Sequence, residues 1–304
     1  MRRTTAVMAA CALATFSLAL AASPAQARFL GMGGHSKPHT SVTDADIAQV
    51  QRAIDEQRFI DAGRMLDQAS LAGIHDNRLV LMTAELSLAR GQTETALTQF
   101  RTIDTDPASR GKAFEGEGVA LSVLGRREEA LITLQKAVAE DPSAWRAWNA
   151  LGSEYDNRHD WTQAEAAYDH ALVDSGGAAI VINNRGYSRL LQNRLDEAAS
   201  DFVEALKKRP DLNAARTNLR LAMAMRGDYD RAVAGGAQTD QATLLNNAGF
   251  AAILRGDYAK AQDLLDQAMK IKGEYYGRAS ANLDLARDMT SRGAPAPTAA
   301  HVDR

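Results

Sequence analysis

Alanine recurs every 34 residues through most of this chain. The series consists of Ala62, Ala96, Ala130, Ala164, Ala198 and Ala232. A period of this length is typical of stacked helix-turn-helix units, in which each unit packs only against its neighbours. Gly118, Gly152 and Gly186 form a second series with the same period, as expected where two helices cross closely and a larger side chain would overpack the contact. The period predicts an all-α, right-handed α-solenoid.

The period shortens once, toward the C-terminal end. Ala261 follows Ala232 by 29 residues, and Gly249 continues the glycine series with the same deficit. Five residues are therefore missing near Gly235-Gly236, where we expect a truncated second helix. The whole pattern predicts about seven helix-turn-helix units and a C-terminal capping helix within residues 44–291.

Turn signals occur at the ends of the expected helices. Glycine occupies the stop position between two helices at Gly91, Gly125, Gly227 and Gly256. His159 and Asn193 replace it in two units, and both residue types tolerate a positive φ better than most. The β-branched run Ala179–Ile182 resembles a strand locally, but the register places it in a first helix, and repeat packing normally overrides such a propensity.

The first 27 residues have the three parts of an export signal. Arg2-Arg3 precedes an apolar stretch from Ala6 to Ala22, and Ala25-Gln26-Ala27 is a small-x-small cleavage site. We expect cleavage after Ala27 and a periplasmic protein with no transmembrane segment after signal removal. The alternative is lipoprotein processing at Cys11, because residues 8–11 loosely resemble a lipobox. Cleavage after Ala27 would remove Cys11, the one cysteine of the chain, and with it any disulfide.

Charge and composition limit the remaining possibilities. Loss of residues 1–27 removes two arginines and no acids from the 35 basic residues, so 33 would face 38 acidic ones. A nucleic-acid-binding protein normally has a basic surplus, so we expect no nucleic-acid partner. Residues 28–43 and 292–304 are irregular and rich in Gly, Pro or Ala, and we interpret them as a flexible linker and a disordered tail.

No pattern of an active site is present. Walker, Rossmann, nucleophile-elbow and zincin motifs are absent, and Gly31–Gly34 lacks the flanking strand and helix of a phosphate-binding loop. His35 and His39 lack a third metal ligand, so we interpret them as solvated polar residues of the linker. We therefore expect no enzymatic activity, no cofactor and no metal.

The residues around the anchors resemble the tetratricopeptide repeat (TPR). The unit with the strongest match has the residues Trp148, Leu151, Gly152, Tyr155, Ala164, Tyr168 and Ala171. The resemblance implies that the first helices line a concave groove in which a protein or peptide partner binds.

Asparagines are the candidate contacts on these first helices. Asn184, Asn218 and Asn247 share one repeat position, and Asn149, Asn183 and Asn246 share the position before it. In other TPR proteins such asparagines bind the main chain of an extended peptide, and a carboxamide suits this role because it both donates and accepts. The alternative is that some of them cap loops or join neighbouring helices. Arg146, together with Lys112, matches only part of the basic pattern with which some TPR proteins bind a terminal carboxylate.

The chain also resembles the TadD family of tight-adherence (Flp) pilus assembly proteins. The export signal and the segments Ile182–Tyr187, Asn218–Ala222 and Leu244–Phe250 carry this resemblance. It implies a periplasmic scaffold that mediates protein-protein interactions in pilus or secretion-system assembly, with pilus or secretin components as partners. A general chaperone-like or envelope-assembly TPR adaptor is the alternative, because its sequence would look the same.

Overall fold

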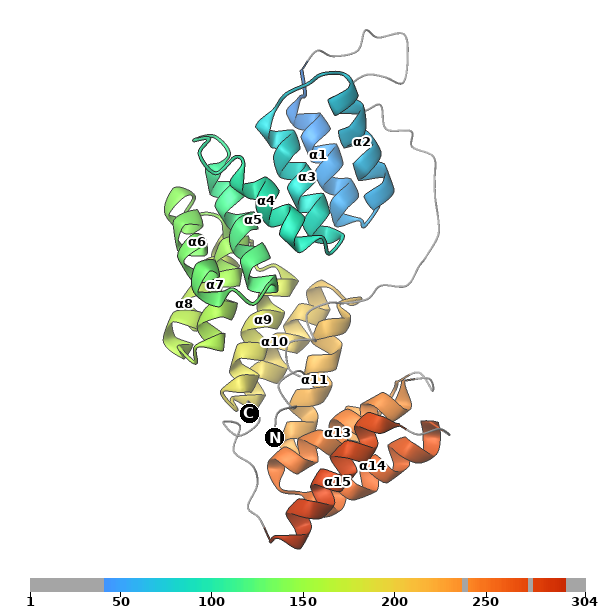
Figure 1. Ribbon diagram of the computed structural model, residues 1–304. Coiled ribbons are helices and arrows are strands. Elements are labelled where there is room, and N and C mark those ends of the chain that lie inside the picture. The colour runs from blue at the N-terminus through green and yellow to red at the C-terminus, as the bar shows by residue number, and fades with distance from the viewer. Residues whose placement is uncertain (1–40, 237–239, 273–275, 294–304) are drawn as a thin grey trace. The chain divides into compact units, whose positions relative to one another are not determined.

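The chain folds into consecutive helices joined by short connections, as a computed structural model shows (Figure 1). The structure describes residues 41–236, 240–272 and 276–293, and within these ranges there is no strand. The helices are α1 (Asp44–Asp55), α2 (Phe59–Leu71), α3 (Asn77–Ala89), α4 (Thr93–Arg101), α5 (Arg110–Val123), α6 (Arg127–Glu140), α7 (Trp145–Asn157), α8 (Trp161–Asp174), α9 (Ala179–Leu191), α10 (Leu195–Lys208), α11 (Asn213–Arg226), α12 (Tyr229–Val233), α13 (Gln241–Arg255), α14 (Tyr258–Lys272) and α15 (Gly277–Ser291).

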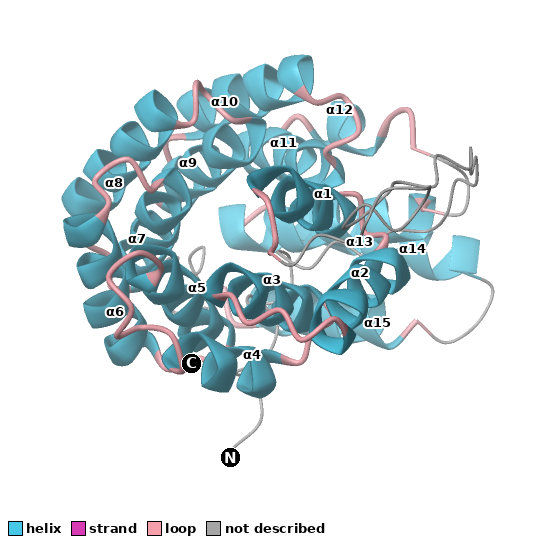
Figure 2. Cartoon of the chain, turned by 90° about the horizontal axis from the view of Figure 1, so that it is seen from above, coloured by secondary structure: helices cyan, strands magenta, loops and turns pink. Residues whose placement is uncertain are grey.

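These helices form seven consecutive pairs, and α15 packs on the last pair. The expected all-α solenoid of about seven units with a C-terminal capping helix is thereby confirmed. The described residues divide into an N-terminal body (41–177) and a C-terminal body (178–293). Within the N-terminal body, the first helices α3, α5 and α7 lie along one side and the second helices α4, α6 and α8 along the other (Figure 2). In the C-terminal body, α9 and α11 are first helices, and α10 packs against both.

Each repeat glycine lies against a large side chain of the second helix in its own unit. A Cβ atom added to Gly152 would be 2.6 Å from the Tyr168 ring, well inside contact distance. The same relation, always between residues 16 apart, holds for Gly118 with Leu134, Gly186 with Phe202 and Gly249 with Leu265. Glycine therefore allows the two helices of a unit to cross with an aromatic or leucine side chain between their backbones.

The repeat alanines all lie in the core. The structure buries Ala62, Ala96, Ala130, Ala164, Ala198, Ala232 and Ala261. Six of them are 0% exposed, and Ala232, in the shortened unit, is 3% exposed. The 34-residue period of alanines thus marks the buried contact that each second helix makes in the core.

The turn signals operate as the sequence indicates. His159 and Asn193 have φ values of 57° and 60°, the left-handed conformation that glycine adopts at the same place in other units. Ala179–Ile182 begins helix α9, so the helical interpretation of this β-branched run is confirmed. The truncated second helix is also confirmed, since α12 has 5 residues while its neighbours α10 and α14 have 14 and 15.

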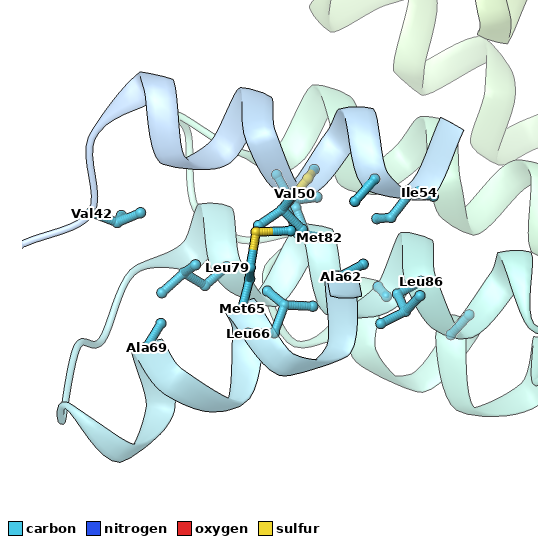
Figure 3. Close-up of a cluster of buried hydrophobic side chains, with 14 of the residues drawn as sticks. Val42, Val50, Ile54, Ala62, Met65, Leu66, Ala69, Leu79, Met82 and Leu86 are labelled. Carbon is cyan, nitrogen blue, oxygen red and sulfur yellow. The ribbon is translucent and has the colours of Figure 1, made fainter. Parts of the chain in front are cut away.

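The first two units share a core that extends beyond the expected start of the folded region (Figure 3). Val42 is 5% exposed and belongs to the cluster of Val50, Met65 and Met82. Thr43 caps α1, because its Oγ1 accepts a hydrogen bond from the Asp46 amide while the Asp46 carboxylate accepts one from the Thr43 amide. Residues 42 and 43, which fall within the expected flexible linker, therefore belong to the folded part of the chain, because residue 42 is packed in the core and residue 43 is held by the cap.

Several expectations concern residues outside the described ranges. The export signal (1–27), Cys11, most of the linker and most of the C-terminal tail (294–304) belong to this group. No helix in the described part of the chain combines the length and apolar character needed to cross a bilayer.

Candidate functional site

Three asparagines in the C-terminal body form a chain of hydrogen bonds between two first helices. The Asn218 Nδ2 on α11 donates to the Asn183 Oδ1 on α9 over 3.1 Å. The Asn183 Nδ2 in turn donates to the Oδ1 of its neighbour Asn184, also over 3.1 Å. The bond from Asn218 thus joins α9 to α11, and the bond from Asn183 orients the side chain of Asn184.

A second chain repeats this arrangement nearer the C-terminus. The Asn282 Nδ2 on α15 donates to the Asn246 Oδ1 on α13 over 3.0 Å. The Asn246 Nδ2 donates to the Asn247 Oδ1 over 3.3 Å. Asn282 is absent from the set expected from the sequence. Its spacing could have revealed it, because it follows Asn246 by 36 residues, close to the 35 that separate Asn218 from Asn183.

The asparagines of each hydrogen-bond chain differ in burial, and this difference indicates two roles. Asn183, Asn218 and Asn246 are buried, with 4%, 8% and 6% of their surface exposed. Asn184 and Asn247 are half-buried. The buried members join neighbouring helices, which is one of the two alternatives left open by the sequence. The half-buried members retain access to solvent, as the alternative of peptide binding requires. Asn218 is buried and Asn247 is half-buried, so these two residues have different surroundings despite their shared repeat position.

The N-terminal body presents charged groups on its first helices. Arg146 and Asn149 lie on α7, Lys112 and Glu115 on α5, and Glu85 on α3. Arg146 is exposed, and its guanidinium lies 5.4 Å from the centre of the Trp145 ring. Asn149 is half-buried. We call Glu85, Lys112, Glu115 and Arg146 together the charged face.

Burial and like charges perturb the two carboxyls of the charged face. The pKa of Glu115 is raised to about 7, mainly by burial. Arg146 and Lys112 oppose this increase, whereas the negative charge of Glu85 adds to it. Burial also raises the pKa of Glu85, again against the effect of Arg146. Sequence reasoning missed both glutamates. A signal was available for Glu115, because Glu115, Asn149 and Asn183 are successively 34 residues apart.

The described residues contain no group of three or more His, Cys, Asp or Glu side chains that could hold a metal ion. The two candidate sites consist of asparagine amide pairs and of charged side chains. The arrangement can therefore bind through hydrogen bonds and charge.

Comparison with known proteins agrees with this geometry. No model of a known protein family matches the chain. It is 31% identical to tetratricopeptide repeat protein 13 of Homo sapiens over 147 residues, which are 48% of this chain and 16% of that protein. It is 26% identical to tetratricopeptide repeat protein 21B of Mus musculus over 166 residues, or 53% and 12% of the two chains. The chain thus spans less than a fifth of the length of these curated relatives.

Solved structures share the same repeat architecture. TTC0263, a thermophilic TPR protein of Thermus thermophilus, superposes with a TM-score of 0.52 at 19% identity, over 58% of this chain and 96% of that one. The chain has the tetratricopeptide repeat fold. The chain also superposes on the Pseudomonas aeruginosa pilF structure, with a TM-score of 0.53 at 20% identity over 70% and 96% of the two chains. At these identities, the likeness to solved structures shows the fold alone.

TPR proteins generally mediate protein-protein interactions, and their scaffold is typically non-enzymatic. The asparagine chains and the charged face are therefore the candidate binding surfaces of this TPR-like fold.

Proposed function

We propose that this protein is a periplasmic scaffold that binds an extended segment of a partner protein along its first helices. The observation that carries the proposal is the pair of asparagine chains, each of which ends in a half-buried carboxamide at the same repeat position. Asn184 and Asn247 would contact the main chain of the partner, because a carboxamide can both donate to a peptide C=O group and accept from a peptide N–H group.

The buried asparagines orient these contacts in advance. Asn183 donates to Asn184 and Asn246 donates to Asn247, so each outer amide is held in place before a partner arrives. A side chain that is already ordered loses less conformational entropy on binding. Asn247 retains capacity for a partner, because none of the described residues accepts a hydrogen bond from its Nδ2.

The double variant Asn184→Ala/Asn247→Ala should bind the partner about fivefold to 150-fold more weakly, because two hydrogen bonds of about 0.5–1.5 kcal/mol each would be lost. Its melting temperature should fall less than that of the control below, because Asn184 and Asn247 are half-buried and water can replace them as acceptors for Asn183 and Asn246. The matched control is Asn218→Ala/Asn246→Ala, which should lower the melting temperature by roughly 2 °C or more, because it leaves buried amides unsatisfied. Calorimetric affinity and thermal melting would be measured on both variants. Wild-type affinity of the Asn184→Ala/Asn247→Ala variant would contradict the proposal.

We further propose that the protein serves Flp pilus or secretion-system assembly. The resemblance of its asparagine-bearing segments to the TadD family supports this role, and the likeness to the pilF structure is compatible with it at the level of the fold. A chaperone-like or envelope-assembly adaptor is the second candidate. A pull-down from envelope extract separates the two. Recovery of a secretin, a secretion ATPase or a pilin supports the first, whereas recovery of outer-membrane or cell-wall assembly factors supports the second.

The periplasmic location rests on the export signal in residues 1–27. Mass spectrometry of the protein from the envelope fraction tests it. A mature N-terminus at Arg28 supports a freely diffusing periplasmic protein, whereas a lipid on Cys11 would indicate membrane attachment.

A further inference from the structure

The charged face extends over consecutive first helices of the N-terminal body. Helix α3 packs against α1 and α5, and α5 packs against α7, so the side chains of Glu85, Glu115 and Arg146 come from neighbouring helices. Both glutamates are half-buried, whereas Lys112 and Arg146 are exposed. The carboxyls thus lie deeper in this face than the two cationic groups.

Three other carboxylates of this body are paired with arginine. Arg101 donates to Glu117 over 2.7 Å, Arg110 donates to Glu140 over 2.7 Å, and Arg126 donates to Glu129 over 2.6 Å. Within the described ranges, Glu85 and Glu115 form no ion pair within 4.0 Å, and neither do Lys112 and Arg146. Charges of both signs therefore lie near one another on this face without pairing.

Two further acidic groups act on Glu85 and Glu115. Asp55 of α1 acts on Glu85, and Asp141, in the turn between α6 and α7, acts on Glu115. Gln51 of α1 is the neutral polar group next to Glu85. Four carboxyls thus face the two cations Lys112 and Arg146. Burial has removed part of the water around Glu85 and Glu115, and in the described ranges neither carboxyl has a cation within ion-pair distance to replace that water; a charge in that situation is destabilising.

We propose that this face binds a lysine or arginine side chain of the partner protein, with its cationic end between Glu85 and Glu115. A cation fits better than an anion here because the unpaired groups that have lost water are carboxyls, while the exposed Lys112 and Arg146 remain hydrated. The inference rests on the proposed function, because it assigns a chemical character to the segment that binds along the first helices.

The test uses the purified protein and three peptides of equal length, rich in Lys and Ser, in Glu and Ser, or in Gly and Ser. The Lys/Ser peptide should bind most tightly, and Glu85→Gln/Glu115→Gln should weaken its binding about tenfold or more. The control is Glu128→Gln, since this side chain on α6 is 82% exposed and lies on a second helix. Unchanged Lys/Ser binding in the double glutamine variant, preference for the Glu/Ser peptide, or failure of the Lys/Ser peptide to bind would each overturn the inference.

The pH dependence provides a second readout. A cation needs ionised carboxyls, so affinity for the Lys/Ser peptide should increase as the pH rises through about 7, where Glu115 loses its proton. Glu115→Gln should reduce this dependence. A pH-independent affinity in the wild-type protein would contradict the inference.

Melting temperature distinguishes a binding residue from a structural one. The raised pKa means that folded Glu115 keeps its proton between about pH 4.5 and 7, so its contribution to stability decreases as the pH rises through this window. Glu115→Gln should therefore raise the melting temperature at pH values above 7 while it weakens Lys/Ser binding. A lower melting temperature together with unchanged binding would assign Glu115 to the scaffold.

The proposed function would fail in a different way. If Asn184→Ala/Asn247→Ala leaves partner binding intact, the asparagine contacts are wrong whatever the charge preference is. If all three peptides bind equally well and the glutamine variants have no effect, main-chain binding is retained and only the inference about a cationic side chain is refuted.

Discussion

Asp201→Ala should lower the free energy of unfolding by about 3–5 kcal/mol, because it removes a buried carboxylate that forms ion pairs with two arginines. Asp201 is 3% exposed. Its carboxylate accepts hydrogen bonds from the Arg185 Nη2 over 2.9 Å and from the Arg189 Nη1 over 2.8 Å, and these bonds join α9 to α10. Removal of the carboxylate would leave both guanidinium groups without their shared counter-charge. Urea-induced unfolding of the variant and the wild-type protein measures the effect.

Two control variants separate this effect from a general loss of ion pairs. Asp201→Asn keeps the shape and part of the hydrogen bonding, so it should destabilise less than Asp201→Ala. Glu129→Ala removes an exposed pair with Arg126 and should change the urea midpoint little. If Asp201→Ala and Glu129→Ala shift the midpoint equally, the ion pairs of Asp201 do not stabilise the α9 and α10 pair.

Gly152→Ala should destabilise the protein by about 1–3 kcal/mol through overpacking. The new methyl group would lie 2.6 Å from the Tyr168 ring. The ring cannot move away without loss of a contact, because the Tyr168 hydroxyl donates a 2.8 Å hydrogen bond to the buried Asp156 carboxylate. Thermal or urea unfolding would detect the change.

Gly186→Ala is the matched comparison at the same repeat position. Its Cβ would lie 2.9 Å from the Phe202 ring, which has no hydroxyl to anchor it, so the destabilisation should be smaller. An unfolding midpoint of Gly152→Ala equal to that of the wild-type protein would refute the close crossing of α7 and α8.

The fold could be predicted from the sequence because the same helix contacts recur at a fixed spacing along the chain. Ala164 and Gly152 recur at fixed intervals since each unit makes the same contact between its two helices. The missing five residues before Ala261 predict the short α12 for the same reason. Val42 falls outside this reasoning, because it precedes the first repeat and is ordered by the core of the first two units and by the cap at Thr43.

The site was less predictable, because a sequence period shows which helix face a residue lies on but does not show where its side chain points. Asn184, Asn218 and Asn247 share one repeat position, yet Asn218 bonds back to α9 while Asn247 accepts a bond from its own helix. Asn282 belongs to the capping helix, where the repeat pattern ends. The importance of Glu115 depends on burial and on the distance to Glu85, and neither can be read from spacing.

The central claim is that the partner lies along the first helices, and site-specific photo-crosslinking in living cells tests it most directly. A photoreactive amino acid would replace Thr217, which is exposed on α11 beside Asn218, or Val203, which is 40% exposed on the second helix α10. Our account predicts a crosslinked partner from position 217 and none from position 203. A partner crosslinked from position 203 and not from 217 would contradict it.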